Sequence, residues 1–212
     1  MATSIGGSKR QCDARERVLA AAYHLFRLGG TRNIGVDKIV ASSGVAKMSL
    51  YRHFKSKEDL VTAFLERREQ LWTAGLLKTE VSQRAVEPAE RLLAVFDVLD
   101  DWFRSKDFDG CSFVNVLLEY PPDYPTHGRA AVHLANIRSF LRKLAGEAGI
   151  ADPRDFANTW HMMMNGAIIA AREGNLEAAR QVKDAARLFL KARLPSASNS
   201  LSQQPSKMAA GR

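Results

Sequence analysis

Residues 35–57 carry two short helical patterns separated by a glycine, and this segment constrains the fold more than any other part of the chain. The i, i+3, i+4 spacing of apolar residues over 36–40 predicts a two-turn helix with one buried face. Gly44 can adopt the left-handed conformation that ends such a helix. Leu50 and Phe54 lie four residues apart and are expected to face inward from a second short helix. The pattern predicts a helix-turn-helix, the unit that places its second helix in the DNA major groove.

The second helix leaves an unusual number of hydrogen-bond donors for its outer face. Ser56 to Asp59 fits a capping box that begins the following helix and leaves Lys57 near the positive end of that helix. A lysine in this position is suited to holding a phosphate. We expect base-edge contacts from Lys47, Met48 and Ser49, phosphate contacts from Tyr51, His53 and Lys57, and either kind from Arg52.

At these residues the chain resembles a known family. Residues 15–65 are similar to the DNA-binding domain of the TetR/AcrR family of transcriptional regulators. The shared stretches are Arg17-Val-Leu-Ala-Ala-Ala-Tyr-His-Leu-Phe26, the Gly29-Gly-Thr31 loop, Ile39-Val-Ala-Ser-Ser-Gly44-Val, Leu50-Tyr-Arg-His-Phe54 and Ser56-Lys-Glu-Asp-Leu60. The sequence departs from the family at three positions. Gly35 and Ala46 stand where the family often has a Ser or Thr that caps a short helix, and Met48 stands where the family commonly has a small residue. These departures bear on the operator that is read and not on the fold.

The distribution of charge agrees with a DNA-binding N-terminus. Residues 1–60 hold 11 Lys and Arg against 5 Asp and Glu, whereas residues 61–212 hold 20 against 18. Clustered positive charge is the electrostatic footprint of phosphate binding, although a solvated basic face is a common alternative. Together with the helix-turn-helix, the charge favours DNA.

Composition excludes several other classes of protein. The hydrophobic content of 46% and the charged content of 25% are typical of a soluble protein. We find no run of eighteen apolar residues and no signal-peptide pattern, so we expect a cytoplasmic protein. Cys12 and Cys111 suggest neither a disulfide framework nor a metal site. Glu119 or Cys111 could be paired with a histidine as catalytic groups, but no sequence spacing supports such a pair. We therefore predict no enzyme, no metal and no cofactor.

The chain beyond residue 60 has the pattern of an all-α protein. We expect helices over residues 57–79, 88–103, 111–120, 126–148, 153–172 and 176–193. In the first of these helices, Leu60, Phe64, Leu71 and Trp72 are expected to point inward. The predicted organisation is a flexible basic arm (1–10), a helix-turn-helix domain (11–57), a helical ligand-binding and dimerisation domain (58–194) and a disordered tail (195–212).

The last two helices have the composition of a dimer interface. Small residues permit close approach of helices at Gly166, Ala167, Ala170, Ala171, Ala179 and Ala186, beside the larger Phe156, Trp160, Met163, Ile168, Val182 and Phe189. The same residues could equally form the core of the monomer. The family resemblance implies a four-helix bundle with a second subunit, and a two-fold pair of recognition helices doubles the number of base contacts.

The middle of the chain is expected to contain the sensor. Gly110-Cys-Ser-Phe-Val-Asn115 and Glu119 are similar to a stretch in the LmrA/YxaF branch of the family. We expect a largely apolar pocket with a few polar anchors, the usual design of a small-molecule site. Its candidate residues are Trp102, Phe103, Cys111, Phe113, Asn115, Glu119, Trp160, Met163, Met164 and Asn165. Ordinary core packing is the alternative for each, His161 is expected at the surface or satisfied in the core, and the apolar neighbours of Cys111 argue against a redox role.

These observations predict a homodimeric regulator that binds a double-stranded DNA operator and responds to a small, largely apolar effector. Repression is the usual mode of the resembled family, whereas the residues themselves are compatible with repression and activation. A constitutive architectural DNA-binding dimer is the alternative. A well-filled core would favour that alternative, and a cavity among residues 92–170 would favour a regulator.

Overall fold

The computed structural model describes residues 6–195, with side chains described from Asp13 onward, and all regular structure in this range is helical. The N-terminal helices are α1 (Gly6–Gly29), α2 (Val36–Ser43) and α3 (Lys47–His53). A long helical rod follows as α4 (Lys57–Arg68), η1 (Glu69–Lys78) and α5 (Thr79–Arg84). The remaining helices are α6 (Pro88–Phe103), α7 (Ser112–Glu119), α8 (Pro125–Glu147), α9 (Pro153–Arg172) and α10 (Ala178–Arg193).

The all-α prediction and most predicted helix bounds are confirmed. Pro88 and Pro153 lie in the first turns of α6 and α9, where the missing N–H is harmless, and the Asp152 carboxylate accepts a hydrogen bond from the Asp155 amide at 3.0 Å. α1 already begins at Gly6, inside the segment predicted to be a flexible arm, and residues 1–5 of that segment lie outside the described residues. The predicted disordered tail lies outside them too, apart from Pro195.

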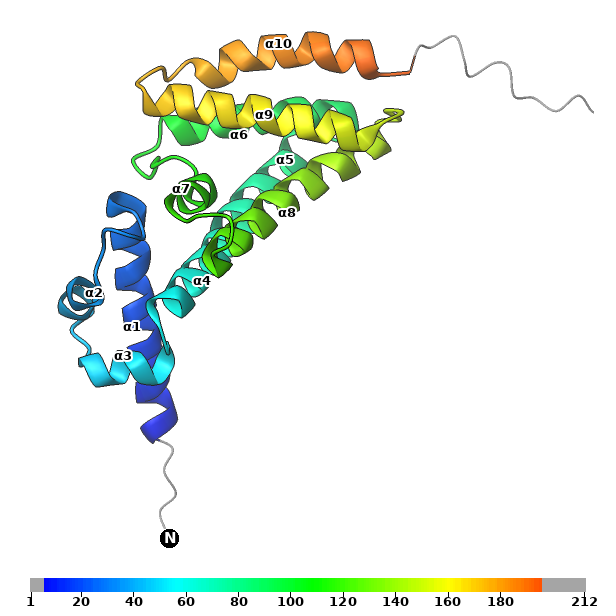
Figure 1. Cartoon of the computed structure of the whole chain (residues 1–212). Coiled ribbons are helices and arrows are strands. Elements are labelled where there is room, and N and C mark those ends of the chain that lie inside the picture. The colour runs from blue at the N-terminus through cyan, green and yellow to red at the C-terminus, as the bar shows by residue number, and fades with distance from the viewer. Residues whose placement is uncertain (1–5, 196–212) are drawn as a thin grey trace, which may run out of the picture.

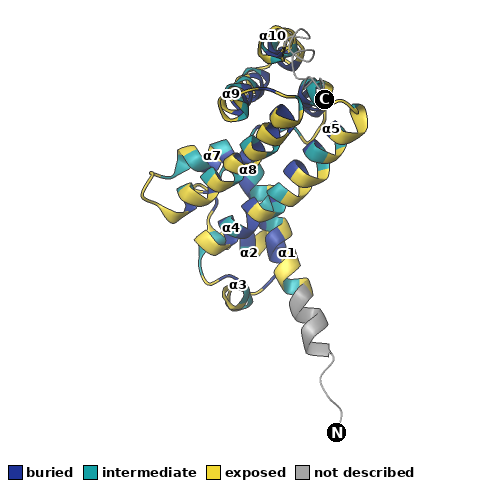
Figure 2. Ribbon diagram, turned by 90° about the vertical axis from the view of Figure 1, so that its right-hand side faces the viewer, coloured by how far each residue is buried: buried dark blue, intermediate teal, exposed yellow. Residues whose placement is uncertain are grey.

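The helices form two packed regions that the rod α4–η1–α5 connects. In Figure 1, α1, α2 and α3 lie together at one end, while α9 and α10 lie at the other end over α6. Figure 2 shows buried residues on the inward faces of the helices and exposed residues outside. Phe64 of α4 packs its ring edge-on against Tyr23 and Phe26 of α1, with ring centroids 5.5 Å apart in both pairs. The rod is therefore anchored in the core of the N-terminal region.

The rod differs from the regular helix that the sequence predicts over residues 57–79, because residues 69–78 are π-helical. The wider π turn brings the Gln70 carbonyl oxygen so near Gly75 that a Cβ there would lie 2.8 Å from it. The turn also changes which side chains face inward. Trp72 is buried as predicted, but the prediction for Leu71 is wrong, since its side chain is 56% exposed. A π segment within an α-helix often marks a functional site.

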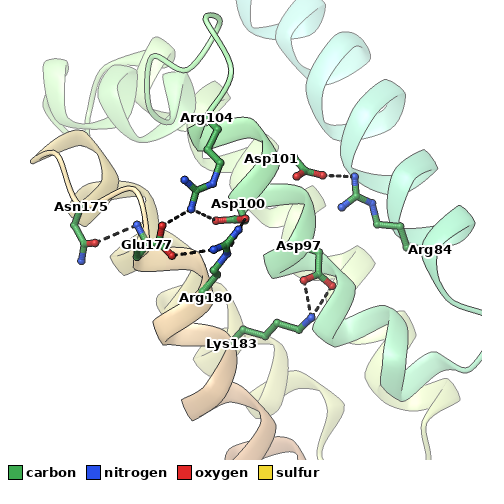
Figure 3. A network of polar contacts seen from close by, with 9 residues as sticks. All are labelled: Arg84, Asp97, Asp100, Asp101, Arg104, Asn175, Glu177, Arg180 and Lys183. Atoms are coloured by element: carbon green, nitrogen blue, oxygen red, sulfur yellow. Dashed lines mark hydrogen bonds and ion pairs between the residues drawn. The ribbon is translucent and has the colours of Figure 1, made fainter.

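α10 is fixed to α6 by a row of ion pairs (Figure 3). Lys183 donates to both oxygens of Asp97 at 2.6 and 2.7 Å, and Arg180 lies 3.0 Å from Asp100. Arg104, directly after α6, lies 2.5 Å from Glu177, which directly precedes α10. This face of α10 is therefore occupied within the monomer.

Candidate nucleic-acid interface

The turn between α2 and α3 is held by contacts from α1 and from the end of α2. Gly44 has φ +61°, the left-handed conformation predicted for it, and its amide donates to the Val40 carbonyl. Arg17 of α1 donates to the carbonyls of Ser43 and Gly44 at 2.7 and 3.2 Å. Ser43 is buried, and its hydroxyl donates to the Val40 carbonyl at 3.1 Å and accepts from the Val45 amide at 3.3 Å. These contacts fix the angle between the two helices.

α3 presents its two faces as the apolar spacing predicts. Leu50 and Phe54 are buried in the core with α1. Met48 is 71% exposed and Tyr51 is 39% exposed, which is unusual for large apolar side chains. The polar residues named from the sequence lie on the same seven-residue helix, where Lys47 and Arg52 are exposed and Ser49 and His53 are half-buried. α3 therefore exposes both donors for base edges and apolar groups for thymine methyls.

Two of the predicted DNA-binding lysines have partners within the protein. Lys47 lies 2.7 Å from the Asp37 carboxylate of α2, and this hydrogen bond raises the pKa of Lys47. Lys57 donates to the Arg32 carbonyl at 3.0 Å, and partial burial lowers the pKa of Lys57. Both ammonium groups would exchange these partners for DNA, and the exposed pair with Asp37 is of a kind that is worth little.

Sequence reasoning did not name two cations of this region. Lys38 of α2 and Lys55, which follows α3, are exposed and form no ion pair among the described residues. The sequence did contain a signal for each: Lys38 is a polar residue within the apolar pattern of residues 36–40, and Lys55 directly follows the inward-facing Phe54. Gly35 and Ala46 stand at the N-termini of α2 and α3, and neither caps its helix with a side chain. The Lys38 and Ser49 amides already donate to the Gly35 and Ala46 carbonyls, at 3.2 and 2.8 Å. The amides of the first two residues of each helix remain open to another acceptor, and helix N-termini of this kind bind phosphate.

The structure does not bring the predicted ligand residues together into one cavity. Trp102 lines a groove of about 430 Å³ between α1, the π segment and α6, together with Trp72 and Tyr23. Three others, Cys111, Asn115 and Asn165, line a separate hollow of about 340 Å³ between α7 and α9. The remaining members line neither of these two hollows: Phe103, Phe113, Glu119, Trp160, Met163 and Met164.

The core between these two hollows is closely packed. Trp72, Trp102 and Phe113 surround a void of only about 10 Å³. Trp72 and Trp102 pack with ring centroids 5.0 Å apart, and the indole N–H of Trp72 is buried without a hydrogen-bond partner among the described residues. Desolvation raises the pKa of the Cys111 thiol, which disfavours the thiolate that redox chemistry needs. His161 is buried rather than at the surface, and its pKa falls to about 4 because burial and the nearby Arg138 disfavour the charged ring.

Glu119 contacts the DNA-binding region, although the sequence pattern predicts a polar anchor for the ligand at this position. Its carboxylate accepts from the Thr31 hydroxyl and from the amides of Thr31 and Arg32, the latter two at 2.8 and 3.1 Å. Arg32 in turn donates to the Glu119 carbonyl at 3.0 Å. The end of α7 is thereby fastened to the loop that leads from α1 into α2. No local pattern indicates this contact, because 88 positions separate Thr31 from Glu119.

A second polar contact joins the two regions through Asp109, in the segment between α6 and α7. The buried Asp109 carboxylate accepts from Arg27 of α1 and from Arg68 of α4, the second at 3.2 Å. Arg68 also stacks over the Trp102 ring, 5.5 Å from its centroid. Segment 105–120 thus contacts α1 and α4, the helices that precede and follow the helix-turn-helix in the chain.

Comparison with known proteins agrees with this geometry. Residues 18–64 match the family model described as bacterial regulatory proteins of the tetR family. A TetR-type transcriptional regulator from Streptomyces avermitilis has 30% identity and a TM-score of 0.71, and the alignment covers 82% of this chain and 97% of that one. The chain belongs to the TetR family. A second TetR-family regulator, from Streptomyces coelicolor, has 26% identity and a TM-score of 0.76, with coverages of 86% and 96%.

Curated relatives that match part of the chain are also named as helix-turn-helix transcriptional regulators. An uncharacterised helix-turn-helix regulator from Mycobacterium tuberculosis is 36% identical over 80 residues, which are 38% of this chain and 39% of that protein. LmrA from Bacillus subtilis, also named as a transcriptional regulator, is 31% identical over 100 residues, or 46% and 52% of the two chains. The chain thus spans about two fifths to one half of the length of these curated relatives. As a TetR-family member the protein is a DNA-binding transcriptional regulator and not an enzyme.

Among residues 6–195, no helix has both the length and the hydropathy needed to cross a bilayer.

Proposed function

We propose that the protein is a homodimeric repressor that binds a two-fold operator through α3 and leaves it when a small, largely apolar molecule binds the helical domain. The observation that carries this proposal is the pair of contacts made by segment 105–120, at Asp109 and Glu119. They connect the helices of the sensor region to α1, to the loop after α1 and to α4.

DNA reading is assigned to the exposed face of α3. Lys47, Met48 and Ser49 would face base edges, with Met48 suited to a thymine methyl. Tyr51, His53 and Lys57 would bind phosphates, and Arg52 is able to do either. Lys38 and Lys55 add exposed positive charge to the same region. Two such helices would dock in major grooves one or more helical turns apart.

Dimerisation is assigned to α9 and α10, through residues that differ from the ones named from sequence. Phe156, Trp160 and Ala167 are buried within the monomer, so they are core residues. The exposed apolar side chains on the two helices are Met162, Ile169 and Leu188, with exposures of 65, 56 and 72%. Because α10 already uses its other face against α6, these side chains remain available to a second subunit.

The effector is assigned to the groove lined by Tyr23, Trp72 and Trp102. Its aromatic walls suit an apolar ligand. The groove includes α1, the π segment and α6, so an occupant would contact the DNA-binding and sensor regions at once. Arg68, which holds Asp109, also lines this groove.

In the proposed mechanism, the bound effector shifts the side chains of Arg68 and Trp102. This shift changes the ion pair between Arg68 and Asp109. Displacement of segment 105–120 would alter the position of α1 and the start of α4, and so the separation of the two recognition helices. A ligand that binds only the DNA-incompetent separation lowers operator affinity by linkage, and DNA lowers ligand affinity by the same factor.

One observation favours the alternative of a constitutive DNA-binding dimer. The interior void beside Trp72 and Phe113 measures only about 10 Å³, and the larger hollows are open grooves. A core that is already filled can serve dimerisation alone. Release of DNA by a ligand distinguishes the two functions.

The test is a fluorescence-polarisation titration of the protein with duplex DNA from upstream of its own gene and with a scrambled duplex, over a series of salt concentrations. We expect salt-sensitive binding with a strong preference for the upstream duplex. Tyr51→Ala should weaken operator binding about tenfold or more, because it removes an exposed contact of α3, while circular dichroism and dimer mass stay unchanged. Wild-type affinity in Tyr51→Ala would refute the assignment of α3. If apolar aromatic compounds never release the operator probe, the constitutive alternative holds.

A further inference from the structure

Three arginines on α8 and α9 have no acidic partner among the described residues. Arg138 and Arg142 lie one helical turn apart on α8, and Arg154 lies in the first turn of α9. On α10, by contrast, all the arginines contact a carboxylate: Arg180, Arg187 and Arg193. Arg138, Arg142 and Arg154 therefore contrast with the arginines of the neighbouring helix α10.

The three arginines line one hollow of about 520 Å³, which we call the arginine groove. Its other polar lining is neutral and consists of Asn136, Ser139 and Asn158, and no carboxylate within the described part of the chain borders it. A volume of this size is within the range that accepts small molecules. The groove therefore offers donors from three arginines and three neutral side chains, with no acceptor of full negative charge from residues 13–195.

Positive charge continues past the groove along α8. A second hollow of about 670 Å³ shares Asn136, Ser139 and Arg142 with the arginine groove. This hollow adds the cations Lys78, Arg91 and Lys143 and the carboxylates Glu69 and Glu147. Residues 61–212 together hold just two more Lys and Arg than Asp and Glu, so this face carries more positive excess than the whole region does.

Within the described residues, nothing compensates the charges of the arginine groove. The titratable ring beside Arg138 is His161, which is buried and whose pKa of about 4 keeps it neutral at physiological pH. Like charges on one face repel, and water only partly screens them at short range. Arginine forks match the geometry of phosphate and carboxylate oxygens. A multivalent anion in the groove would relieve the repulsion and meet several donors at once.

We propose that the arginine groove is a binding site for a small multivalent oxyanion, a phosphate ester or a polycarboxylate. The site is separate from the surface that reads DNA, because α9 and α3 lie at opposite ends of the molecule (Figure 1). It is also separate from the groove with aromatic walls at Trp72 and Trp102, with which it shares no lining residue. Its ligand would act in addition to the apolar effector.

The test uses isothermal titration calorimetry of the full-length protein with inorganic pyrophosphate and with citrate, each at an ionic strength matched with sodium chloride. We expect saturable binding of at least one of the two anions with one site per protomer. The double variant Arg138→Gln, Arg142→Gln should weaken this binding about tenfold or more for each charge-assisted hydrogen bond that it removes. The tighter of the two anions identifies the headgroup chemistry.

Two matched variants keep the result specific to the groove. Arg129→Gln removes an exposed arginine from the same helix α8 but outside the groove, and it should bind the anion as wild type does. Arg52→Gln removes one from the DNA-reading helix, and it should do so too. Absence of saturable binding by both anions would overturn the proposal. The proposal would also be overturned if Arg129→Gln lost as much anion affinity as the double variant, or if only Arg52→Gln lost affinity. Circular dichroism of each variant excludes unfolding as the cause.

Discussion

Replacement of Asp109 by asparagine should destabilise the protein far more than its single charge suggests. The side chains of Asp109 and Arg68 are only 8% and 6% exposed, and that of Arg27 is 18% exposed. Asp109→Asn leaves two guanidinium groups largely out of water without this counter-charge. Arg68 would keep the Tyr23 hydroxyl at 3.3 Å and the face of Trp102. Loss of one partner from a buried pair typically costs about 3–5 kcal/mol.

We take the lower end of that range, about 3 kcal/mol, because Arg27 retains the Asp107 carbonyl at 2.7 Å and some access to water. For a domain of this length, the loss corresponds to a fall in Tm of about 6–12 °C. Urea and thermal unfolding monitored by tryptophan fluorescence and circular dichroism measure it. Asp107→Asn is the matched control, since its side chain is 87% exposed and lies 3.9 Å from Arg27, so little change is expected.

The double variant Arg68→Met, Asp109→Asn examines the cause of that loss. Removing both partners of a buried pair often restores stability, so the double variant should be more stable than Asp109→Asn alone. The electrostatic explanation of this contact is refuted if Asp109→Asn unfolds no more easily than Asp107→Asn. It is also refuted if the losses of unfolding free energy from Arg68→Met and Asp109→Asn simply add in the double variant.

Three further outcomes are expected. Gly35→Ser should raise the free energy of unfolding by about a few tenths of a kcal/mol, because its hydroxyl can cap α2 and a Cβ there meets nothing within 4 Å; a lower Tm would contradict this. Leu188→Glu should convert the dimer to a folded monomer in light scattering after size exclusion, and an unchanged dimer would remove α10 from the interface. His161 has a folded pKa of about 4, below its ordinary value of 6.5, so the unfolded chain takes up protons first and stability falls as pH drops through this window. Between about pH 7 and about pH 5, the free energy of unfolding of wild type should fall by about 2 kcal/mol more than that of His161→Gln, as measured in urea titrations. Equal falls would refute the lowered pKa of His161.

Local chemistry explains why the DNA-binding region was predictable from sequence. The turn at Gly44 and the inward pair Leu50 and Phe54 depend on residues within one or two helical turns of each other. The Ser56 cap is local too, and its hydroxyl accepts from the Asp59 amide at 3.1 Å. Such signals survive in any tertiary context. The polar partners of Lys47 and Lys57 come from α2 and from the loop before it, so the spacing within α3 and α4 does not reveal them.

The C-terminal region was predictable as helices, whereas the ligand site proposed there was not. A period of 3.6 residues identifies an apolar face, and it does not distinguish packing within the monomer from packing against a ligand or a second subunit. Trp160 and Ala167 have the pattern expected of ligand or dimer contacts, and the structure buries both in the monomer. Leu71 departs from its predicted inward position for a different reason, since the π turn at residues 69–78 shifts the helical phase and has no simple sequence pattern.

The placement of Glu119 and Asp109 gives the proposed switch a definite physical form. Both carboxylates hold donors of the DNA-binding region, Glu119 at the loop after α1 and Asp109 at Arg27 of α1 and Arg68 of α4. α1 holds the turn before the recognition helix through Arg17 and packs against α3, so a shift of α1 relative to α4 would move α3 with it. An effector therefore needs no large cavity in the core. Under the proposed mechanism it would only have to displace segment 105–120, which the groove with Arg68 and Trp102 in its wall already borders.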